Sequence, residues 1–291
     1  MSSKKFRVAI LGSGNIGTDL LLKIQRSPVL ECVAFVGRSL HSKGMARAMA
    51  LNVKCSDKSI QYIVGNAKEV DVVFDATSAK DHLIHAKILK ELGIKVIDLT
   101  PARVGPMCVP SVNSDQCKNE LNINMITCGG QASIPIAHVI GSYFEHVEYI
   151  EVVSSIASKS AGPATRLNLD EYIETTEKGV QLFSGAKKTK AILNLNPAVP
   201  PIDMQTTVYA KVTSPDMVDF NVKLQEMINR IKSYVPGYGL VNVPVYENGL
   251  LMVMVRVRGL GDYLPEYAGN LDIINCAAIA MAEEYATLVT V

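Results

Sequence analysis

A short glycine-rich segment near the start of the chain, Gly12-Ser13-Gly14-Asn15-Ile16-Gly17, constrains the fold more than any other feature. It follows an apolar stretch, Phe6–Leu11, and precedes leucines and an isoleucine at helical spacing. In this context the first glycine makes a tight turn, the second lets a pyrophosphate approach, and the third lets the helix pack on the strand. The segment therefore predicts an N-terminal Rossmann domain of the α/β class. The alternative is a strand–helix packing turn without a ligand.

The end of the second predicted strand bears on which dinucleotide is bound. Residues 30–36 form this strand, and Gly37-Arg38-Ser39 follows it. An acidic residue that would bind the ribose of NAD is absent here, and Arg38 could instead attract a 2′-phosphate. The choice between NAD and NADP stays open on this pattern.

Three further predicted strands, 70–76, 94–99 and 122–127, end in small or polar residues. Ligands of open α/β folds bind at this carboxyl edge of the sheet. Each polar residue taken alone could equally be a helix cap or a turn residue. The residues that could line a site at this edge are Asp75, Thr77, Ser78, Asp98 and Thr100.

The segment 124–135 carries the candidate nucleophile. It is typical of a strand end, a glycine turn, and a helix that Ser133 caps. A helix N-terminus would lower the thiol pKa of Cys128, while Gly129 and Gly130 leave room for a substrate and could direct N–H groups at an oxyanion. The alternative is a buried structural cysteine. Together with a dinucleotide site, the thiol predicts covalent oxidation of an aldehyde.

Composition argues against several other classes of protein. The formal net charge of +1 gives no reason to expect nucleic acid or an anionic membrane as a partner. No apolar run is long enough to span a membrane, and the N-terminus lacks a signal-peptide pattern. Six cysteines without a Cys-x-x-Cys pair predict reduced thiols, a cytoplasmic location and no zinc site. His82 and His85 lie three apart without a carboxylate pattern, so we expect a solvated helix face and no metal.

The pattern changes after residue 145, where long extended runs alternate with single helices. This predicts an α+β unit with a mixed or antiparallel sheet and helices on one face. One of its helices follows Asn168 and presents Tyr172, Ile173, Thr176 and Val180 on one face. We expect a dinucleotide-binding domain over 1–130, a catalytic and dimerisation domain over 131–268, and a C-terminal helix over 269–291 that packs back on the Rossmann domain.

Six blocks spread over the chain from about residue 6 to the C-terminus carry a family resemblance. They are residues 15–20, 74–79, 97–102, 127–132, 158–163 and 267–272. Together they resemble the acylating (CoA-dependent) acetaldehyde dehydrogenases of meta-cleavage pathways in aromatic hydrocarbon catabolism. The resemblance implies that acetaldehyde, NAD and CoA give acetyl-CoA and NADH. It also implies a fold similar to glyceraldehyde-3-phosphate and aspartate-semialdehyde dehydrogenases, a homodimer, and a complex with 4-hydroxy-2-oxovalerate aldolase.

The same resemblance implies roles for individual residues. Cys128 matches the cysteine that carries the acyl thioester, and Asn270 matches a contact near the nicotinamide, although it could instead cap the last helix. The nucleotide-binding turn corresponds to Ser13, Gly14, Asn15 and Ile16. A second cofactor-contacting loop corresponds to Ser160, Ala161, Gly162, Pro163, Ala164, Thr165, Arg166, Leu167 and Asn168.

The chain departs from the family pattern at two places. The family has an aspartate near the strand that begins at Met204, where it is thought to assist the cysteine, and this position aligns with Thr206. Two possibilities therefore remain for the general base: Asp203 takes this role, or the chain works without such an acid. Between about residues 240 and 262 the chain is also shorter than the family pattern. This segment could contribute to the interface with the aldolase.

Three alternative functions remain on the sequence alone. One is another thiol-dependent semialdehyde dehydrogenase or acyl-phosphate reductase of the same fold, which should carry a basic cluster in the second domain. Another is a reductase in which Cys128 is inert. The third is a non-catalytic NAD-binding sensor.

Overall fold

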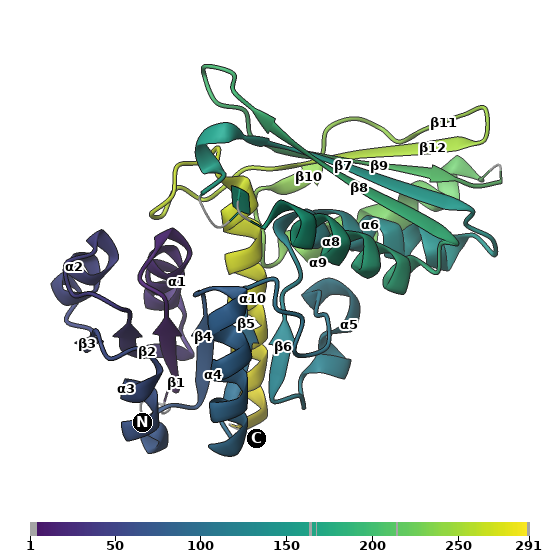
Figure 1. The fold of residues 1–291 in the computed structure, drawn as a ribbon. Coiled ribbons are helices and arrows are strands. Elements are labelled where there is room, and N and C mark those ends of the chain that lie inside the picture. The colour runs from purple at the N-terminus through teal and green to yellow at the C-terminus, as the bar shows by residue number, and fades with distance from the viewer. Residues whose placement is uncertain (1–4, 163–164, 167, 214, 290–291) are drawn as a thin grey trace.

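Two six-stranded β-sheets, each with helices packed on it, make up the chain (Figure 1). The structure is a computed structural model that describes residues 5–162, 165–166, 168–213 and 215–289. The first sheet is parallel and comes from the N-terminal half, whereas the second is mixed and comes from residues 149–257. This arrangement confirms the predicted combination of a Rossmann domain with an α+β domain.

The first sheet has the strand order β3-β2-β1-β4-β5-β6. Its strands are β1 (Phe6–Leu11), β2 (Leu30–Val36), β3 (Cys55–Ser56), β4 (Val72–Asp75), β5 (Lys95–Asp98) and β6 (Asn122–Asn124). The strand order reverses at β1, which pairs with β2 on one side and β4 on the other. In open parallel sheets, a ligand binds at the carboxyl ends of the strands beside such a reversal.

Both faces of the first sheet are buried, which explains why its strands are apolar runs without alternation. Val8 and Ile10 of β1 contribute to one core, whereas Ala9 and Leu11 face a second core on the other side. The helices of this half are α1 (Asn15–Arg26), α2 (Lys43–Ala50), α3 (Ile60–Gly65), α4 (Ala79–Glu91) and α5 (Pro110–Cys117), with a 3₁₀ turn η1 (Ala67–Glu69).

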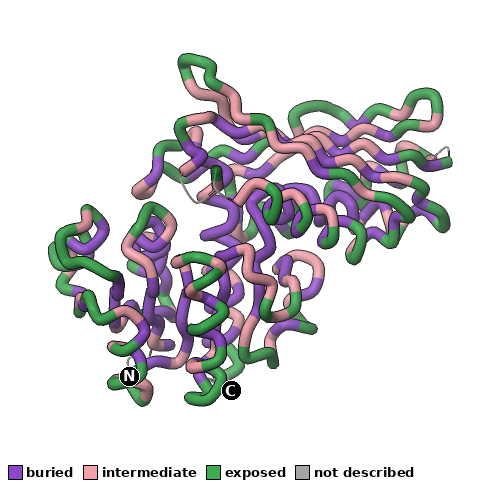
Figure 2. Tube along the Cα trace, viewed as in Figure 1, coloured by how far each residue is buried: buried purple, intermediate pink, exposed green. Residues whose placement is uncertain are grey.

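The second sheet has the order β10-β12-β9-β7-β8, and β11 pairs with β12. Its strands are β7 (Tyr149–Ala157), β8 (Lys188–Asn196), β9 (Met204–Lys211), β10 (Tyr238–Leu240), β11 (Val245–Glu247) and β12 (Leu250–Val257). Helices α6 (Cys128–Tyr143), α8 (Leu169–Ser184) and α9 (Met217–Lys232) lie on one face of this sheet, and a 3₁₀ turn η2 (Ser158–Ser160) follows β7 (Figure 1). Burial alternates along β7 and β9 because the other face carries no helix (Figure 2).

The last helix, α10 (Gly269–Val289), runs along the first sheet and reaches toward the second (Figure 1). Ile274, Ala278, Met281 and Tyr285 on this helix are buried in the same core as α1 and the first sheet. The division into domains at residues 130 and 268 stays a prediction. Among the described residues, no helix is long and apolar enough to cross a membrane.

Candidate active site

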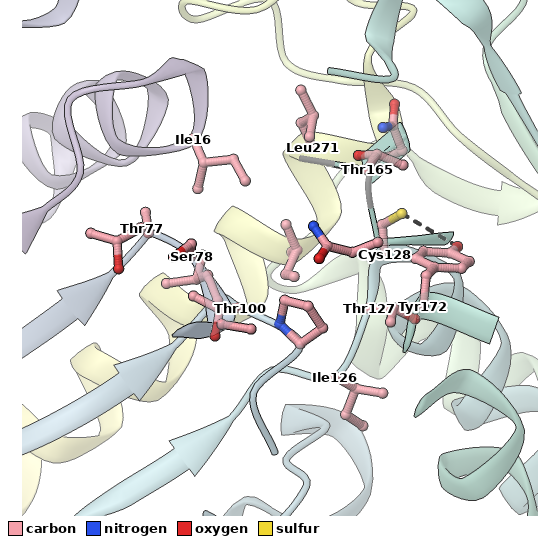
Figure 3. Close-up of a pocket in the computed structure, with 17 residues that line it drawn as sticks. Ile16, Thr77, Ser78, Thr100, Ile126, Thr127, Cys128, Thr165, Tyr172 and Leu271 are labelled. Carbon is pink, nitrogen blue, oxygen red and sulfur yellow. Dashed lines mark hydrogen bonds between the residues drawn. The ribbon is translucent and has the colours of Figure 1, made fainter. Parts of the chain in front are cut away.

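A pocket opens at the carboxyl edge of the first sheet, where it meets α6 and α8 (Figure 3). Among the described residues that line it, Cys128 and Tyr172 are the only ones that ionise in an accessible pH range, and the rest are apolar or neutral polar groups. The lining residues are Ile16, Ala76, Thr77, Ser78, Ala79, Leu99, Thr100, Pro101, Ile126, Thr127, Cys128, Thr165, Asn168, Tyr172, Asn270, Leu271 and Ile274.

The glycine turn at one end of the pocket has the geometry that a dinucleotide needs. Gly12 has a φ of +114°, and a Cβ atom there would lie 2.5 Å from the carbonyl oxygen of Ala76. A Cβ atom at Gly17 would lie 1.9 Å from the oxygen of Gly12, so α1 can approach the turn this closely only because residue 17 is a glycine. A Cβ atom at Gly14 would meet nothing within 4 Å, which leaves space for a pyrophosphate at the start of α1.

The four residues predicted for this turn lie in different environments. Ile16 lines the pocket. Gly14 and Asn15 are exposed at the start of α1, while the hydroxyl of Ser13 lies 2.7 Å from where a Cβ atom of Gly37 would be. A phosphate placed over Gly14 would therefore meet the first backbone N–H groups of α1.

Helix α6 begins at Cys128, five residues before the predicted cap at Ser133. The cap is Thr127, whose hydroxyl oxygen accepts a hydrogen bond from the backbone N–H of Gly130 at 2.8 Å. Gly129 and Gly130 thus belong to the first helical turn, and the hydroxyl of Ser133 donates to the oxygen of Gly129 inside the helix. The predicted cap at Ser133 is therefore wrong, because the Thr127 hydroxyl caps the helix and the two glycines adopt helical rather than turn conformation.

The Cys128 thiol is enclosed by the protein. The residue is 9% exposed, and its Sγ lies 3.5 Å from the hydroxyl of Tyr172 (Figure 3). Burial raises the thiol pKa of Cys128. Hydrogen bonds from Tyr172 and from the backbone N–H of Gly129 favour the thiolate and lower the pKa, but burial has the larger effect. The predicted lowering of this pKa is therefore wrong for the free protein, because desolvation outweighs the helix N-terminus.

Tyr172 is a site residue that the sequence pattern did not reveal. Its position on the apolar face of α8 suggested core packing, but its hydroxyl reaches the thiol. The neighbouring Thr176 ties α8 to the α6 cap, since its hydroxyl lies 2.7 Å from that of Thr127. The available signal was a tyrosine on the buried face of a helix, because a buried phenol needs a polar partner.

Two residues of the predicted cofactor loop, Thr165 and Asn168, line the pocket. Ser160 and Arg166 point elsewhere. The Ser160 hydroxyl donates to a backbone carbonyl three residues earlier at 2.8 Å, and the Arg166 guanidinium donates to the backbone carbonyls of Ala161 and Ser158. Ala161 is buried and Gly162 is partly exposed. Pro163, Ala164 and Leu167 lie outside the described residues.

Asn270, in the first turn of α10, is 1% exposed and lines the pocket. Neither its Nδ2 nor its Oδ1 has a hydrogen-bond partner among the described residues. A buried amide without partners is costly, and a nicotinamide carboxamide offers both the donor and the acceptor that it lacks. This orphaned amide and the glycine turn both fit a bound NAD.

Asp203, the candidate for the general base, does not line the pocket, and neither does Thr206, which stands where the family has its aspartate. Thr206 is buried, and its hydroxyl is 2.9 Å from that of Ser154 on the neighbouring strand. Asp203 lies before β9, with a carboxylate oxygen 4.0 Å from Nε of Arg256.

Comparison with known proteins identifies the family. Residues 7–120 match the model described as semialdehyde dehydrogenase, NAD binding domain, and residues 128–265 match prokaryotic acetaldehyde dehydrogenase, dimerisation. The acetaldehyde dehydrogenase of Spirochaeta aurantia is 67% identical over 98% of this chain and 96% of its own length. The chain belongs to the acetaldehyde dehydrogenase family. The enzyme named acetaldehyde dehydrogenase in Pectobacterium atrosepticum is 57% identical over 98% of this chain and 97% of its own length.

Membership of the acetaldehyde dehydrogenase family confirms the predicted enzyme class, an NAD-dependent aldehyde oxidoreductase. The cofactor prediction is confirmed for NAD by the NAD-binding domain match. Arg38, two residues after β2, is exposed, and nothing in this comparison tests whether NADP can replace NAD.

A buried polar network lies beneath the pocket in this family member. His82 and His85 are buried, and their Nδ1 atoms lie 2.9 and 2.8 Å from the same carboxylate oxygen of Asp75. The expected solvated helix face is therefore wrong. Burial by itself would raise the pKa of Asp75, but the hydrogen bonds from both histidines lower it below its ordinary value. Burial raises the pKa of the nearby Asp98 to about 6.

The network continues from Asp98 to the residue before the Thr127 cap. Asn124 donates to Asp98 Oδ2 and to the carbonyl of Thr100, both at 2.8 Å, and accepts from the backbone N–H of Ile126 at 2.9 Å. Ile126 has a φ of +66°, which is rare for a β-branched residue. Asn124 thus holds the strained backbone that leads into Cys128.

Among the described residues, one group of side chains has metal-like spacing, the carboxylates of Asp19, Asp262 and Asp272. The ammonium of Lys23 lies among them, 2.6 to 3.2 Å from one oxygen of each. The lysine thus supplies the positive charge, and the cluster joins α1 to α10 and the segment before it.

Proposed function

We propose that this protein is an acylating acetaldehyde dehydrogenase in which Cys128 carries the acyl group to CoA. The observation that carries the proposal is the position of the Cys128 thiol at the N-terminus of α6. It shares a pocket with the glycine-turn residue Ile16 and with the Asn270 amide, which has no partner among the described residues. A thiol, a dinucleotide and a space for a small aldehyde are the parts that this chemistry requires.

The reaction begins when Sγ of Cys128 attacks the aldehyde carbon and forms a thiohemiacetal. Developing charge on the aldehyde oxygen is stabilised by the backbone N–H of Gly129 in the first turn of α6, since the N–H of Gly130 already donates to the Thr127 hydroxyl. When bound, NAD would supply the hydride acceptor for this oxidation. The thiohemiacetal loses a hydride from its carbon and a proton from its hydroxyl to solvent, which leaves the thioester on Sγ. The CoA thiolate then attacks the thioester carbon, the bond to Sγ breaks, and the Cys128 thiol is restored by a proton.

The cofactor would be held by residues at both ends of the pocket. Ser13, Gly14, Asn15 and Ile16 would surround the pyrophosphate, and Asn270 would bind the carboxamide. The rest of the nucleotide would contact the loop from Ser160 to Asn168, of which Thr165 and Asn168 face the pocket.

A homodimer fits the match to a dimerisation domain over residues 128–265. We further propose a complex with 4-hydroxy-2-oxovalerate aldolase, which would deliver acetaldehyde within aromatic hydrocarbon catabolism. A cytoplasmic location is supported by six cysteines that are all free thiols.

The test is NADH formation from acetaldehyde and NAD, followed at 340 nm with and without CoA. Sustained turnover that requires CoA, and its loss in Cys128→Ser, is the expected result. A steady rate without CoA would mean that water or phosphate accepts the acyl group, which contradicts the acylating assignment. Repeating the assay with NADP tests the role of Arg38.

A further inference from the structure

The pocket contains a nucleophile but no conventional base. Its described lining has no carboxylate, imidazole or amine, and Asp203 and Thr206 lie outside it. Attack on an aldehyde nevertheless requires the thiol proton to leave sulfur and a proton to reach the carbonyl oxygen. For handling these protons, the described lining offers only neutral hydroxyl and amide side chains.

Tyr172 is the hydroxyl that touches the reacting atom. Its oxygen lies 3.5 Å from Sγ of Cys128, which is hydrogen-bond distance for sulfur (Figure 3). No other side-chain hydrogen bond to this Sγ is found among the described residues. The side chain comes from α8, so the contact brings the helix after the cofactor loop directly onto the nucleophile.

The absence of a side chain at residue 129 makes room for this hydroxyl. A Cβ atom on Gly129 would lie 2.2 Å from the Tyr172 oxygen and 3.2 Å from Oγ of Ser154. The phenol thus occupies space that any other residue at position 129 would fill. Such a close approach to the first turn of α6 places the hydroxyl beside the Gly129 N–H that is assigned to the oxyanion.

We propose that Tyr172 is a catalytic residue that relays the proton during attack of Cys128 on the aldehyde; this rests on the proposed function. The bond from Sγ to the aldehyde carbon forms while the S–H bond breaks. The thiol proton passes to the Tyr172 oxygen, and the Tyr172 proton passes to the aldehyde oxygen, which becomes the hydroxyl of the thiohemiacetal. The tyrosine is regenerated, and no additional base is consumed.

The electrostatics of the site suit a relay better than a permanent base. Burial, together with the adjacent Cys128, holds the pKa of Tyr172 well above its ordinary value. The phenol therefore keeps its proton at neutral pH and can act as a donor. Because both the thiol and the phenol stay protonated, the concerted exchange avoids forming an isolated buried anion.

The test compares Tyr172→Phe with Tyr238→Phe. The first removes only the hydroxyl beside Sγ. The second is a matched control, because Tyr238 is also buried in this core but donates to the backbone oxygen of Ala132 at 2.7 Å. We expect Tyr172→Phe to lower kcat for acetaldehyde about 100-fold, with calorimetric NAD affinity unchanged and Tyr238→Phe close to wild type.

A second readout does not depend on substrate. Alkylation of Cys128 by iodoacetamide, followed by peptide mass spectrometry from pH 6 to 10, should have its midpoint at a pH roughly one unit higher in Tyr172→Phe, because a hydrogen bond to the thiolate is lost. An unchanged kcat and an unchanged alkylation curve would overturn the relay while leaving the dehydrogenase assignment intact. No turnover by the wild-type protein would instead overturn the proposed function, and the alkylation curve would still decide whether Tyr172 acts on the thiol.

Discussion

The side-chain amide of Asn270 is a buried polar group that the described part of the protein does not satisfy. Its nitrogen and oxygen both lack partners, although the residue is 1% exposed. A buried donor or acceptor without a partner costs about 1–3 kcal/mol. The free protein tolerates this cost at the position where a nicotinamide would supply both hydrogen bonds.

We expect Asn270→Ala to weaken NAD binding about 10- to 100-fold, since one or two hydrogen bonds of about 1.5 kcal/mol each are lost from the complex. The melting temperature of the free protein should not fall, because the alanine removes no hydrogen bond that the described residues make. Asn275→Ala is the matched control on the same helix. Its Nδ2 donates to Asp19 at 2.8 Å, so it should melt earlier. Unchanged calorimetric NAD affinity in Asn270→Ala would exclude the carboxamide contact.

The protonation of Cys128 gives a prediction about pH. Burial favours the neutral thiol and raises its pKa, so the thiolate fraction at neutral pH is small and increases with pH. The rate of Cys128 alkylation in the free protein should therefore rise about tenfold for each pH unit through neutrality, with a midpoint above the ordinary thiol value of about 8.5. Peptide mass spectrometry separates Cys128 from the other five cysteines. A midpoint below pH 7 would show that the helix N-terminus outweighs desolvation.

At the scale of elements, the turn from β6 into α6 fixes the position of the nucleophile. Ile126 adopts a φ of +66°, a conformation that costs a non-glycine residue about 1–2 kcal/mol. Asn124 holds this residue in place with one accepted hydrogen bond and two donated ones, and it is fully buried. The strain is thus maintained by the ends of β5 and β6, immediately before Cys128.

Asn124→Ala should both destabilise the protein and slow the reaction. It leaves Asp98, the Thr100 carbonyl and the Ile126 N–H without their partner, which should cost about 2–5 kcal/mol. The relaxed turn should also misplace Sγ and lower kcat about tenfold or more. Denaturant unfolding and steady-state kinetics measure the two effects. The control is Asn122→Ala. Asn122 begins the same strand and contacts His82, and its loss should have the smaller effect on kcat. Equal kcat values in the two variants would contradict the positioning role.

Local patterns predicted the elements better than the contacts between them. The glycine turn and the apolar strands indicated the Rossmann sheet because both are short-range signals. His82 and His85 were expected on a solvated face, since nothing near them in sequence reveals that Asp75 lies beneath α4. The contact between Tyr172 and Cys128 spans 44 residues and depends on how α8 packs against α6, which periodicity does not specify.

At the scale of the whole molecule, the second sheet has one face without helices. Register places Ile192, Val153, Thr207 and Met254 side by side across β8, β7, β9 and β12 on that face. All four are partly exposed. A row of mainly apolar side chains on an open sheet is typical of a surface that another chain covers. The matched dimerisation domain spans this sheet, so we predict that two copies pair through it.

Met254→Glu should convert the dimer into a monomer. Covering an unpaired carboxylate in the middle of an interface costs several kcal/mol, which raises the dimer dissociation constant at least 100-fold. Light scattering measures the mass, and Leu182→Glu is the control, because Leu182 is 67% exposed on α8, on the helix-covered side of the sheet. The Met254 side chain is on the opposite face of the sheet from α6 and Cys128, so the monomer should still bind NAD. A Met254→Glu protein that remains dimeric would place the interface on another surface, and a monomer that no longer binds NAD would mean that pairing supports the pocket as well.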